Sequence, residues 1–210
     1  MTSAPISSSI IQLEQVAEAD FPCVYGDFRI LGFRGRLNGD ASEIVVLKMG
    51  DILNEAAPPL VRIHSQCLTG EVFHSLRCDC GEQLEMALRQ IGAEGRGLLI
   101  YDPQEGRGIG LLNKLKAYQL QDEGADTVEA NEQLGFAADP RSYELAAAVL
   151  RALGVTRARL LSNNPAKVAG LEQAGIEVSE RVPCEVPRSE RTAAYLRTKK
   201  NKLGHILESL

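Results

Sequence analysis

The sequence has no long apolar run and no basic leader. Its longest apolar stretches, residues 44–47 and 97–101, are far shorter than the ~20 residues that a helix needs to cross a bilayer. Residues 1–9 hold no basic segment followed by an apolar one, which is the pattern of a secretory signal. We therefore expect no membrane partner and a cytoplasmic location.

An excess of basic charge is also missing. The 210 residues include 23 Lys and Arg against 28 Asp and Glu, a net charge of −5, and the chain has no Trp, five Tyr and five Phe. An acidic chain with few aromatic side chains is poorly suited to gripping a long nucleic-acid backbone, although one small anion can still bind in a local basic pocket. We expect no nucleic-acid partner.

The composition is that of a folded chain. Apolar residues make up 44% and charged residues 24%, which is typical of a soluble globular protein. Residues 1–10 are rich in Ser and predict a flexible N-terminal tail. The remaining length suits one domain, which we expect to span residues 11–208.

The apolar pattern predicts an α/β fold of the mixed α+β kind, in which N-terminal antiparallel strands precede alternating strands and helices. Short strands are expected at 28–31, 44–47 and 60–64, because clusters of turn-forming residues separate them. Further along, helical spacing of apolar residues alternates with short apolar runs. Helices are predicted over 82–93, 111–124, 146–153, 164–175 and 188–205, and strands over 97–101, 159–161 and 177–182.

The sequence also gives no sign of a disulfide framework. It has five cysteines, and an odd number argues against a set of paired cysteines. Three of them, Cys67, Cys78 and Cys80, lie within fourteen residues with the spacing Cys-x10-Cys-x-Cys. Reduced cysteines clustered in this way are typical metal ligands, and thiolates favour zinc. The isolated Cys23 and Cys184 are expected to be small buried apolar residues.

Three sulfurs leave the fourth zinc position to be decided. A structural site closes it with a fourth side chain, which His64 or His74 could supply, whereas a catalytic site keeps it for water. The polar surroundings of Thr69, Arg77 and Asp79 favour the open position. A zinc-bound water has a pKa near 7 in favourable sites and attacks electrophilic carbon. Three thiolates would give the zinc site a net negative charge, which makes the bound water less acidic. A neighbouring proton acceptor would therefore help to deprotonate this water.

Two segments have the pattern of anion or base contacts. In residues 161–167 a strand ends and a helix begins, with Asn164 as its cap and Pro165 at its first position. This start exposes backbone N–H groups, and Lys167 adds a charge. Residues 104–110 are rich in Gly but match neither a dinucleotide-binding fingerprint nor a P-loop. The carboxylate of Glu105 suits guanine, because it can accept hydrogen bonds from N1–H and the exocyclic amine. Taken singly, each segment also fits an ordinary connection or a turn with a surface ion pair.

Asp139 and Arg141 flank Pro140. In an extended segment, residues two apart face the same way, so a carboxylate and a guanidinium would meet one region of a substrate. A helix-entry turn is the other interpretation of this tripeptide.

Together these segments resemble the GTP cyclohydrolase II family, whose members open the riboflavin pathway. The resemblance covers about residues 12–208 in order and with few gaps. It is carried by residues 62–70, 77–81, 104–114, 126–131, 134–136 and 163–165.

The resemblance implies a homodimeric enzyme with one zinc ion per subunit and magnesium bound with the GTP triphosphate. It implies conversion of GTP to 2,5-diamino-6-hydroxy-4-(5-phosphoribosylamino)pyrimidine, with release of formate and pyrophosphate. Zinc would be held by Cys67, Cys78 and Cys80. The implied GTP contacts are Arg62, Ile63, His64, Ser65, Gln66, Gln83, Glu105, Gly106, Arg107, Thr127, Ser162 and Lys167.

Three further residues match positions with catalytic roles in the family. Asp139 matches the proton acceptor, Tyr118 matches a tyrosine close to the base, and Arg141 matches a residue proposed as the nucleophile at the α-phosphate. Deprotonating a guanidinium at pH 7 costs several kcal/mol, because its pKa exceeds ~12. We therefore expect Arg141 to stabilise charge on the transferring phosphoryl group, with Asp139 orienting it or activating a water.

The sequence departs from the commonest family pattern at three places. Gln66 stands where glutamate is usual, Ser162 replaces threonine and keeps the hydroxyl, and Asp102-Pro103 precedes Gln104 where a basic residue is more frequent. Loss of charge at these positions predicts weaker nucleotide affinity. The zinc set and the Asp139/Arg141 pair are intact.

Three alternatives stay open at this point. One is a diverged family member that stops at a formamidopyrimidine nucleotide, another is a nucleic-acid-binding module stapled by zinc, and the third is a regulatory GTP-binding protein. Some family members are fused to a second riboflavin-pathway enzyme. Because the chain begins about ten residues before the matching region, we expect one activity on it.

Overall fold

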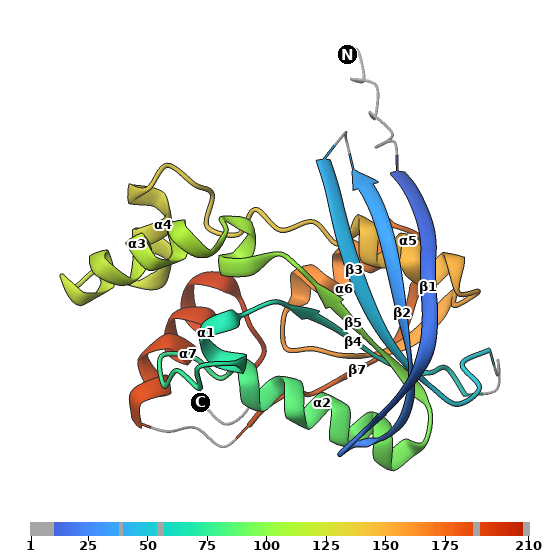
Figure 1. Ribbon diagram of the computed structural model, residues 1–210. Coiled ribbons are helices and arrows are strands. Elements are labelled where there is room, and N and C mark those ends of the chain that lie inside the picture. Colours follow the sequence, from blue (N-terminus) through green and yellow to red (C-terminus); the bar gives the residue numbers. More distant parts are fainter. Residues whose placement is uncertain (1–10, 38–39, 54–56, 187–189, 208–210) are drawn as a thin grey trace.

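The computed structural model describes residues 11–37, 40–53, 57–186 and 190–207 (Figure 1). The expected flexible tail, residues 1–10, lies outside the described residues. The strands are β1 (Ile11–Cys23), β2 (Gly26–Leu37), β3 (Asp40–Met49), β4 (Leu60–Ser65), β5 (Gly97–Asp102), β6 (Arg157–Leu161) and β7 (Glu177–Val182). The helices are α1 (Leu68–Glu71), α2 (Cys80–Glu94), α3 (Leu111–Asp122), α4 (Thr127–Gln133), α5 (Glu144–Ala152), α6 (Pro165–Gln173) and α7 (Glu190–Leu203), with a 3-10 turn at Glu105–Gly108.

The described strands form one seven-stranded mixed sheet in the order β1-β2-β3-β5-β4-β6-β7. β1, β2, β3 and β5 are antiparallel neighbours, whereas β4 pairs in parallel with β5 and β6, and β6 pairs in parallel with β7. The mixed α/β class is confirmed. The expectation that strand 60–64 belongs to the antiparallel region is wrong, because α1 and α2 carry the chain across to β5 and make that pair parallel.

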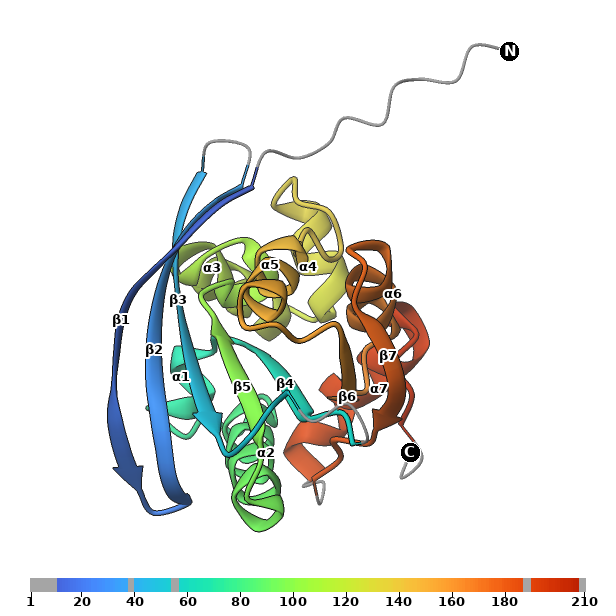
Figure 2. The ribbon, with the colours of Figure 1, turned by 90° about the vertical axis from the view of Figure 1, so that its right-hand side faces the viewer.

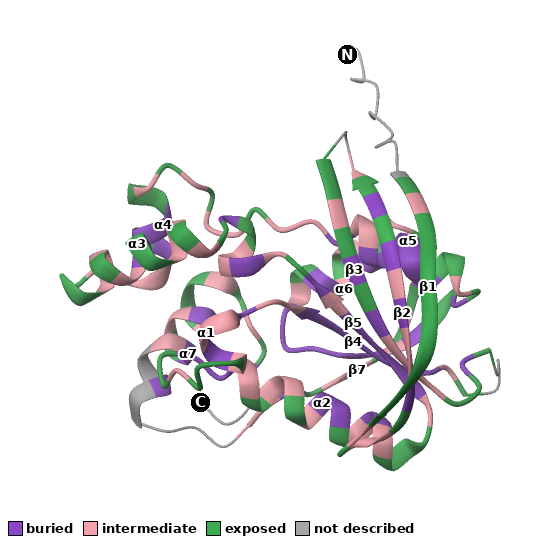
Figure 3. Ribbon diagram, viewed as in Figure 1, coloured by how far each residue is buried: buried purple, intermediate pink, exposed green. Residues whose placement is uncertain are grey.

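Helices cover both faces of the sheet. α5 and α6 pack on one face, where Ala147, Leu150 and Leu171 meet alternate residues of the strands, including Val61 and Leu98. α2 covers the other face through a second buried cluster, Phe28, Leu60, Ala87, Leu88, Ile91, Leu99, Leu161 and Cys184. Buried residues therefore concentrate in the central strands and in the inward faces of these helices (Figure 3). α3 and α4 lie together, away from β1 and β2 (Figures 1 and 2).

The apolar pattern of the sequence does not predict two of the elements, β1 and α4. β1 is an edge strand whose side chains are mostly exposed, so it shows no apolar alternation. α4 begins with a capping box, in which Asp126 accepts from the backbone of Val128 and Glu129 while the Glu129 side chain accepts from Asp126 N–H.

Among the described residues, no helix is long and apolar enough to cross a membrane.

The parallel strands bring the predicted site segments together. Ser65 at the end of β4 lies opposite Asp102 at the end of β5, and Gln66 N–H donates to the Asp102 carbonyl at 2.8 Å. The cysteine-bearing loop follows β4, the Gly-rich loop follows β5, and residues 162–164 follow β6. The carboxyl ends of parallel strands meet at one edge of a sheet, which is where such folds place their ligands.

Candidate active site

One pocket lies at this edge and collects most of the predicted site residues. Those that line it are Arg62, His64, Ser65, Gln66, Cys67, Cys78, Cys80, Gln83, Glu105, Gly106, Arg107, Tyr118, Thr127, Arg141, Ser162 and Lys167. The side chain of Ile63 instead belongs to the core, and its carbonyl accepts from the Lys167 ammonium at 2.8 Å. Asp139 reaches the pocket through its contact with Arg141.

The three cysteines converge although they come from two loops. Cys67 precedes α1, Cys78 precedes α2 and Cys80 is the first residue of α2. Their sulfurs all lie within 4.8 Å of one another, and the sulfurs of Cys67 and Cys78 are 3.7 Å apart. Tetrahedral zinc bound at about 2.3 Å from each sulfur separates the sulfurs by about 3.8 Å. The residues present therefore fit a zinc ion.

Neither histidine proposed as a fourth ligand turns toward the sulfurs. Nε2 of His64 lies 2.9 Å from the Glu71 carboxylate, and His74 is exposed. Within the described part of the chain, no His, Asp or Glu atom joins the three sulfurs. This arrangement matches the set of three protein ligands that leaves a position for water.

Three thiols this close do not all ionise unless a cation joins them. Hydrogen bonds from the thiols of Cys78 and Cys80 lower the pKa of Cys67, and the Lys114 ammonium adds to the effect. The same contacts with Cys67 raise the pKa of Cys78 and of Cys80. A divalent cation removes this conflict, because metal ligation favours all three thiolates at once.

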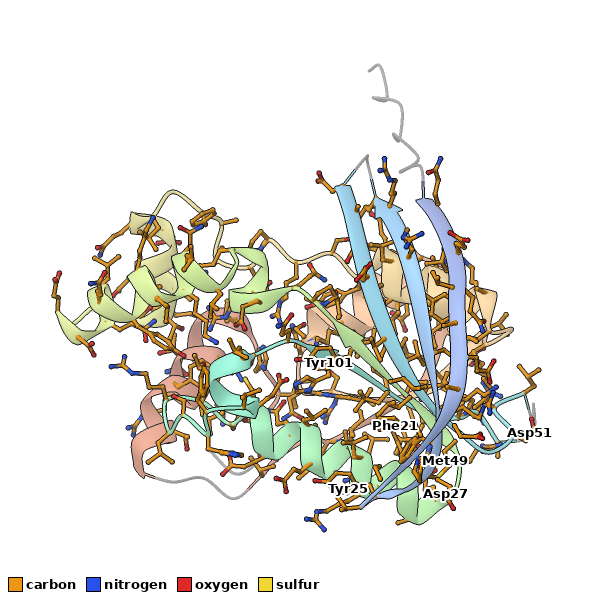
Figure 4. The ribbon with its side chains drawn as sticks, viewed as in Figure 1. Phe21, Tyr25, Asp27, Met49, Asp51 and Tyr101 are labelled. Carbon is orange, nitrogen blue, oxygen red and sulfur yellow. The ribbon has the colours of Figure 1, made fainter. Side chains whose placement is uncertain are left out.

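Glu71 holds Cys67 in place. Its carboxylate accepts from Cys67 N–H at 2.6 Å and from the Tyr101 hydroxyl at 2.5 Å, and it also contacts His64. Tyr101 lies on β5, near the centre of the molecule (Figure 4). Burial lowers the pKa of His64 to about 4, against the opposing effect of Glu71. His64 is therefore neutral near pH 7, and its Nδ1 is a buried polar atom without a partner among the described residues.

Glu105 holds the residue that follows Cys67, Leu68 at the start of α1. One oxygen accepts from Leu68 N–H at 2.7 Å, and the other accepts from the Lys114 ammonium at 2.8 Å and from Gly106 N–H at 2.9 Å. Both oxygens of Glu105 thus already accept hydrogen bonds from the protein. In this structure the carboxylate braces the cysteine loop against the Gly-rich loop, a role that the sequence did not indicate.

The Gly-rich loop turns through two left-handed residues. Gly106 has φ 62° and Arg107 has φ 61°, which is natural for glycine and strained for arginine. The Arg107 guanidinium donates to the Thr127 hydroxyl at 3.0 Å. A strained residue held by a partner at a pocket is a frequent mark of a binding site.

Three basic side chains of the pocket, Arg62, Arg141 and Lys167, lie close to one another. Asn164 caps α6 by accepting from Ala166 N–H at 2.9 Å, with Pro165 at the first helical position, as the sequence predicts. Lys167 is 5% exposed, and burial together with the charges of Arg62 and Arg141 lowers its pKa. An anion placed among these three groups would be strongly favoured, because it would relieve their mutual repulsion.

Asp139 and Arg141 face each other. Arg141 Nε lies 2.7 Å and Nη2 lies 2.5 Å from the two carboxylate oxygens, so the pair is bidentate. Burial opposes both charges, but the paired hydrogen bonds prevail: the pKa of Asp139 is lowered and that of Arg141 is raised. Arg141 also approaches the Ser65 hydroxyl at 3.4 Å. A guanidinium held in this way stays protonated, which supports charge stabilisation over nucleophilic attack.

Tyr118 is a residue of α3 and contacts the cysteine loop at Thr69. Its hydroxyl is 3.1 Å from the Thr69 hydroxyl, and the Arg77 guanidinium lies 4.8 Å from its ring centroid. Burial raises its pKa, so the hydroxyl is protonated near pH 7. The phenol therefore presents a protonated hydroxyl at the wall of the pocket.

Several pocket residues escaped the sequence analysis. They include Gln104, Lys114, Asn131, Asn163, Tyr195, Lys199 and His205. Lys114 and Asn131 lie inside motifs that carry the family resemblance, but nothing in their local pattern indicates a contact. Tyr195, Lys199 and His205 belong to the C-terminal segment, which reads from sequence only as a basic helix.

The fold and the site define an α/β protein with a cluster of three cysteines that could hold a metal ion, beside a pocket lined by basic side chains. A family model described as GTP cyclohydrolase II matches residues 14–183, and the chain belongs to this family. It is 55% identical over 197 residues to the GTP cyclohydrolase-2 of Shigella boydii, covering 94% of this chain and 99% of that protein. The GTP cyclohydrolase-2 of Klebsiella pneumoniae is 54% identical over 199 residues, 95% of this chain and 98% of that protein.

Longer relatives match as well. The riboflavin biosynthesis protein RibBA of Bacillus subtilis is 54% identical over 195 residues, which are 93% of this chain and 48% of that protein. The chain thus spans about half the length of the RibBA relatives that it matches.

Proposed function

We propose that this protein opens the imidazole ring of GTP and releases formate and pyrophosphate. The remaining product would be 2,5-diamino-6-hydroxy-4-(5-phosphoribosylamino)pyrimidine, made in the first step of riboflavin biosynthesis. The observation that carries the proposal is the convergence of three thiols and the basic side chains of Arg62, Arg141 and Lys167 on one pocket. The family membership and the names of the relatives support the same activity.

Zinc held by Cys67, Cys78 and Cys80 would supply an activated water and Lewis-acid chemistry for attack at guanine C8. The protein positions the substrate around it. Tyr118 contributes a protonated hydroxyl at the wall where the base would lie. The backbone N–H groups of Cys67 and Leu68 are fixed by Glu71 and Glu105, so the loop that bears the sulfur is held before substrate arrives.

The cationic side of the pocket suits the triphosphate, which would carry magnesium. Lys167 and Arg62 neutralise phosphate charge from fixed positions, because both are buried and tied to backbone carbonyls. Arg141 stabilises charge that develops on the transferring phosphoryl group, and Asp139 keeps its planar guanidinium aligned. We propose that the remaining contacts with GTP are His64, Ser65, Gln66, Gln83, Glu105, Gly106, Arg107, Thr127 and Ser162.

The deciding experiment measures zinc content together with formate and pyrophosphate release from GTP. We expect one zinc per subunit and equal amounts of formate and pyrophosphate. Release of pyrophosphate without formate would instead identify a family member that stops at the formamidopyrimidine nucleotide. GTP binding without turnover would favour a regulatory protein, and salt-sensitive binding of RNA or DNA would favour a nucleic-acid module.

We also propose that residues 11–208 act as one catalytic domain and that the protein is a cytoplasmic homodimer. Light scattering on the purified protein tests the oligomeric state. A mass equal to one subunit over the working concentration range would contradict the dimer.

A further inference from the structure

The C-terminal helix α7 contributes to the pocket although no role follows from its sequence. Tyr195 and Lys199 line the pocket beside the residues already described. Lys199 is 8% exposed, and its ammonium lies 3.1 Å from an oxygen of Asp79 and 4.2 Å from the Tyr195 ring centroid. Lysine is rarely buried unless its charge is paired, so the burial of Lys199 on an otherwise polar helix points to a specific role.

A chain of buried polar contacts begins at this lysine. Asp79 is 3% exposed and stands between two of the cysteines, and its second oxygen accepts from the Gln83 amide at 2.5 Å. The amide oxygen of Gln83 then accepts from the Arg62 guanidinium at 2.7 Å. Arg62 in turn donates to the Leu161 carbonyl at 3.0 Å. The chain therefore joins α7 to β4 and to the end of β6.

The chain fixes the orientation of the Gln83 amide. A carboxylate only accepts and a guanidinium only donates, so the amide nitrogen must face Asp79 and the amide oxygen must face Arg62. Nε of Arg62 has no partner among the described residues, although it is buried at the pocket. The Nε–H group of Arg62 is thus an unused donor among the described residues, while Nη1 and Nη2 are held by the Leu161 carbonyl and the Gln83 amide oxygen.

We propose that Lys199 is a positioning residue for the nucleotide: it fixes Asp79, and through Gln83 it fixes Arg62, so α7 is a working wall of the binding pocket. The inference rests on the proposed function in one respect, since the nucleotide is the ligand that Arg62 and Gln83 receive. Without Lys199, the buried Asp79 carboxylate loses its cation and draws on the remaining cation of the chain, Arg62. The guanidinium then turns away from the ligand.

Other contacts hold α7 in place independently of Lys199. Ile206 N–H donates to the Asn163 carbonyl at 2.9 Å, and Lys202 pairs with Asp126 and with Glu129 at the start of α4. Replacement of Lys199 should therefore leave the helix docked. This separates a positioning role from a general role in folding.

The test compares Lys199→Met with Lys199→Arg, and Arg197→Met, an exposed neighbour on the same helix, is the control. The measurements are the Kd of a non-hydrolysable GTP analogue, KM and kcat for formate release, and zinc content. We expect Lys199→Met to raise Kd and KM at least tenfold, with zinc retained and kcat changed less than threefold. Lys199→Arg should recover most of the affinity. Unchanged Kd in Lys199→Met, or loss of zinc from it, would overturn the assignment.

A double-mutant cycle checks the route through Asp79. In an Asp79→Asn background, Lys199→Met should change the Kd of the analogue by less than twofold, because the chain is already broken. A tenfold effect that persists in this background would show that Lys199 touches the nucleotide itself, and the positioning role would be wrong.

If Lys199→Met does not fold, the unaltered protein still provides a test. Because binding and docking are linked, the analogue should slow tryptic cleavage within α7 at Arg197 and Lys202. Equal cleavage rates with and without the analogue would refute the proposal. Wild-type formate release is measured first, so a protein that binds the analogue without releasing formate disproves the activity but still allows the affinity test of Lys199.

Discussion

The ammonium of Lys114 lies 3.1 Å from the sulfur of Cys67 and 2.8 Å from the carboxylate of Glu105. Its side chain is only 12% exposed, so this contact operates with little solvent screening. A zinc ion with three thiolates carries a net negative charge, which weakens its effect on bound water. An N–H···S hydrogen bond from a cation offsets part of that charge and orients the ligand.

Lys114→Met removes this cation and keeps most of the side-chain volume. We expect zinc affinity to fall about 10-fold to 100-fold, the usual range for loss of a partner behind a metal ligand. Competition with a chromophoric chelator measures the change. Lys116→Met, an exposed lysine on the same helix, is the matched control. Equal zinc affinity in both variants would rule out a role for Lys114 at the metal.

Cys78→Ser removes one sulfur from the cluster. Because serine is a poor zinc ligand at neutral pH, we expect zinc and formate release to be lost together. Metal analysis of the dialysed protein and a formate assay measure the two effects. Cys23→Ser, at a half-buried position outside the cluster, should retain both. Full formate release from Cys78→Ser would refute the metal assignment.

Arg141→Lys keeps the positive charge but loses the bidentate contact with Asp139. We expect kcat/KM for formate and pyrophosphate release to fall roughly 10-fold to 100-fold, as for loss of a charged hydrogen bond. Zinc content should stay at the wild-type level. Arg157→Lys, which alters an exposed pair with Glu177, is the control. Recovery of a phosphorylated Arg141 peptide by mass spectrometry would establish covalent chemistry and contradict the stabilising role.

His64 predicts how stability depends on pH. Its pKa is about 4 in the folded protein because of burial, against 6.5 ordinarily, so the unfolded chain binds this proton first. Between these values stability rises with pH and is lost on acidification, by up to roughly 3 kcal/mol. Urea unfolding between pH 4.5 and 7.5 measures the slope. His64→Gln should flatten it, whereas an unchanged slope would assign the effect to other groups such as His205, which is present in both proteins.

Leu150 on α5 is fully buried against the sheet. Leu150→Ala should lower the free energy of unfolding by about 2–5 kcal/mol, through lost burial and a cavity. Leu112→Ala, at a position 73% exposed, should change it by less than about 0.5 kcal/mol. Chemical denaturation of both variants checks the difference, and equal losses would show that α5 does not anchor the core.

Elements with a strong local pattern were predictable. Helical spacing of apolar residues indicated α2 and α5, the Asn164-Pro165 start indicated α6, and β7 was predicted with its observed bounds. β1 was not, because an exposed edge strand buries too little to show a pattern. The parallel pairing of β4 also escaped, since strand direction depends on the crossover through α2 and not on the residues of the strand.

The spacing of the cysteines and the family motifs could be recognised in the sequence itself. A turn as short as Cys78–Cys80 also allows few arrangements of its sulfurs. The residues that surround these sulfurs could not be predicted from the sequence. Lys114 lies 47 residues after its partner Cys67, and Lys199 lies 120 residues after its partner Asp79. Local sequence preferences do not determine contacts between residues so far apart in the chain. Only the tertiary structure decided them: β4, β5 and β6 run parallel and end at one edge, so the loops that follow them, with α3 and α7 packed alongside, must share a single pocket.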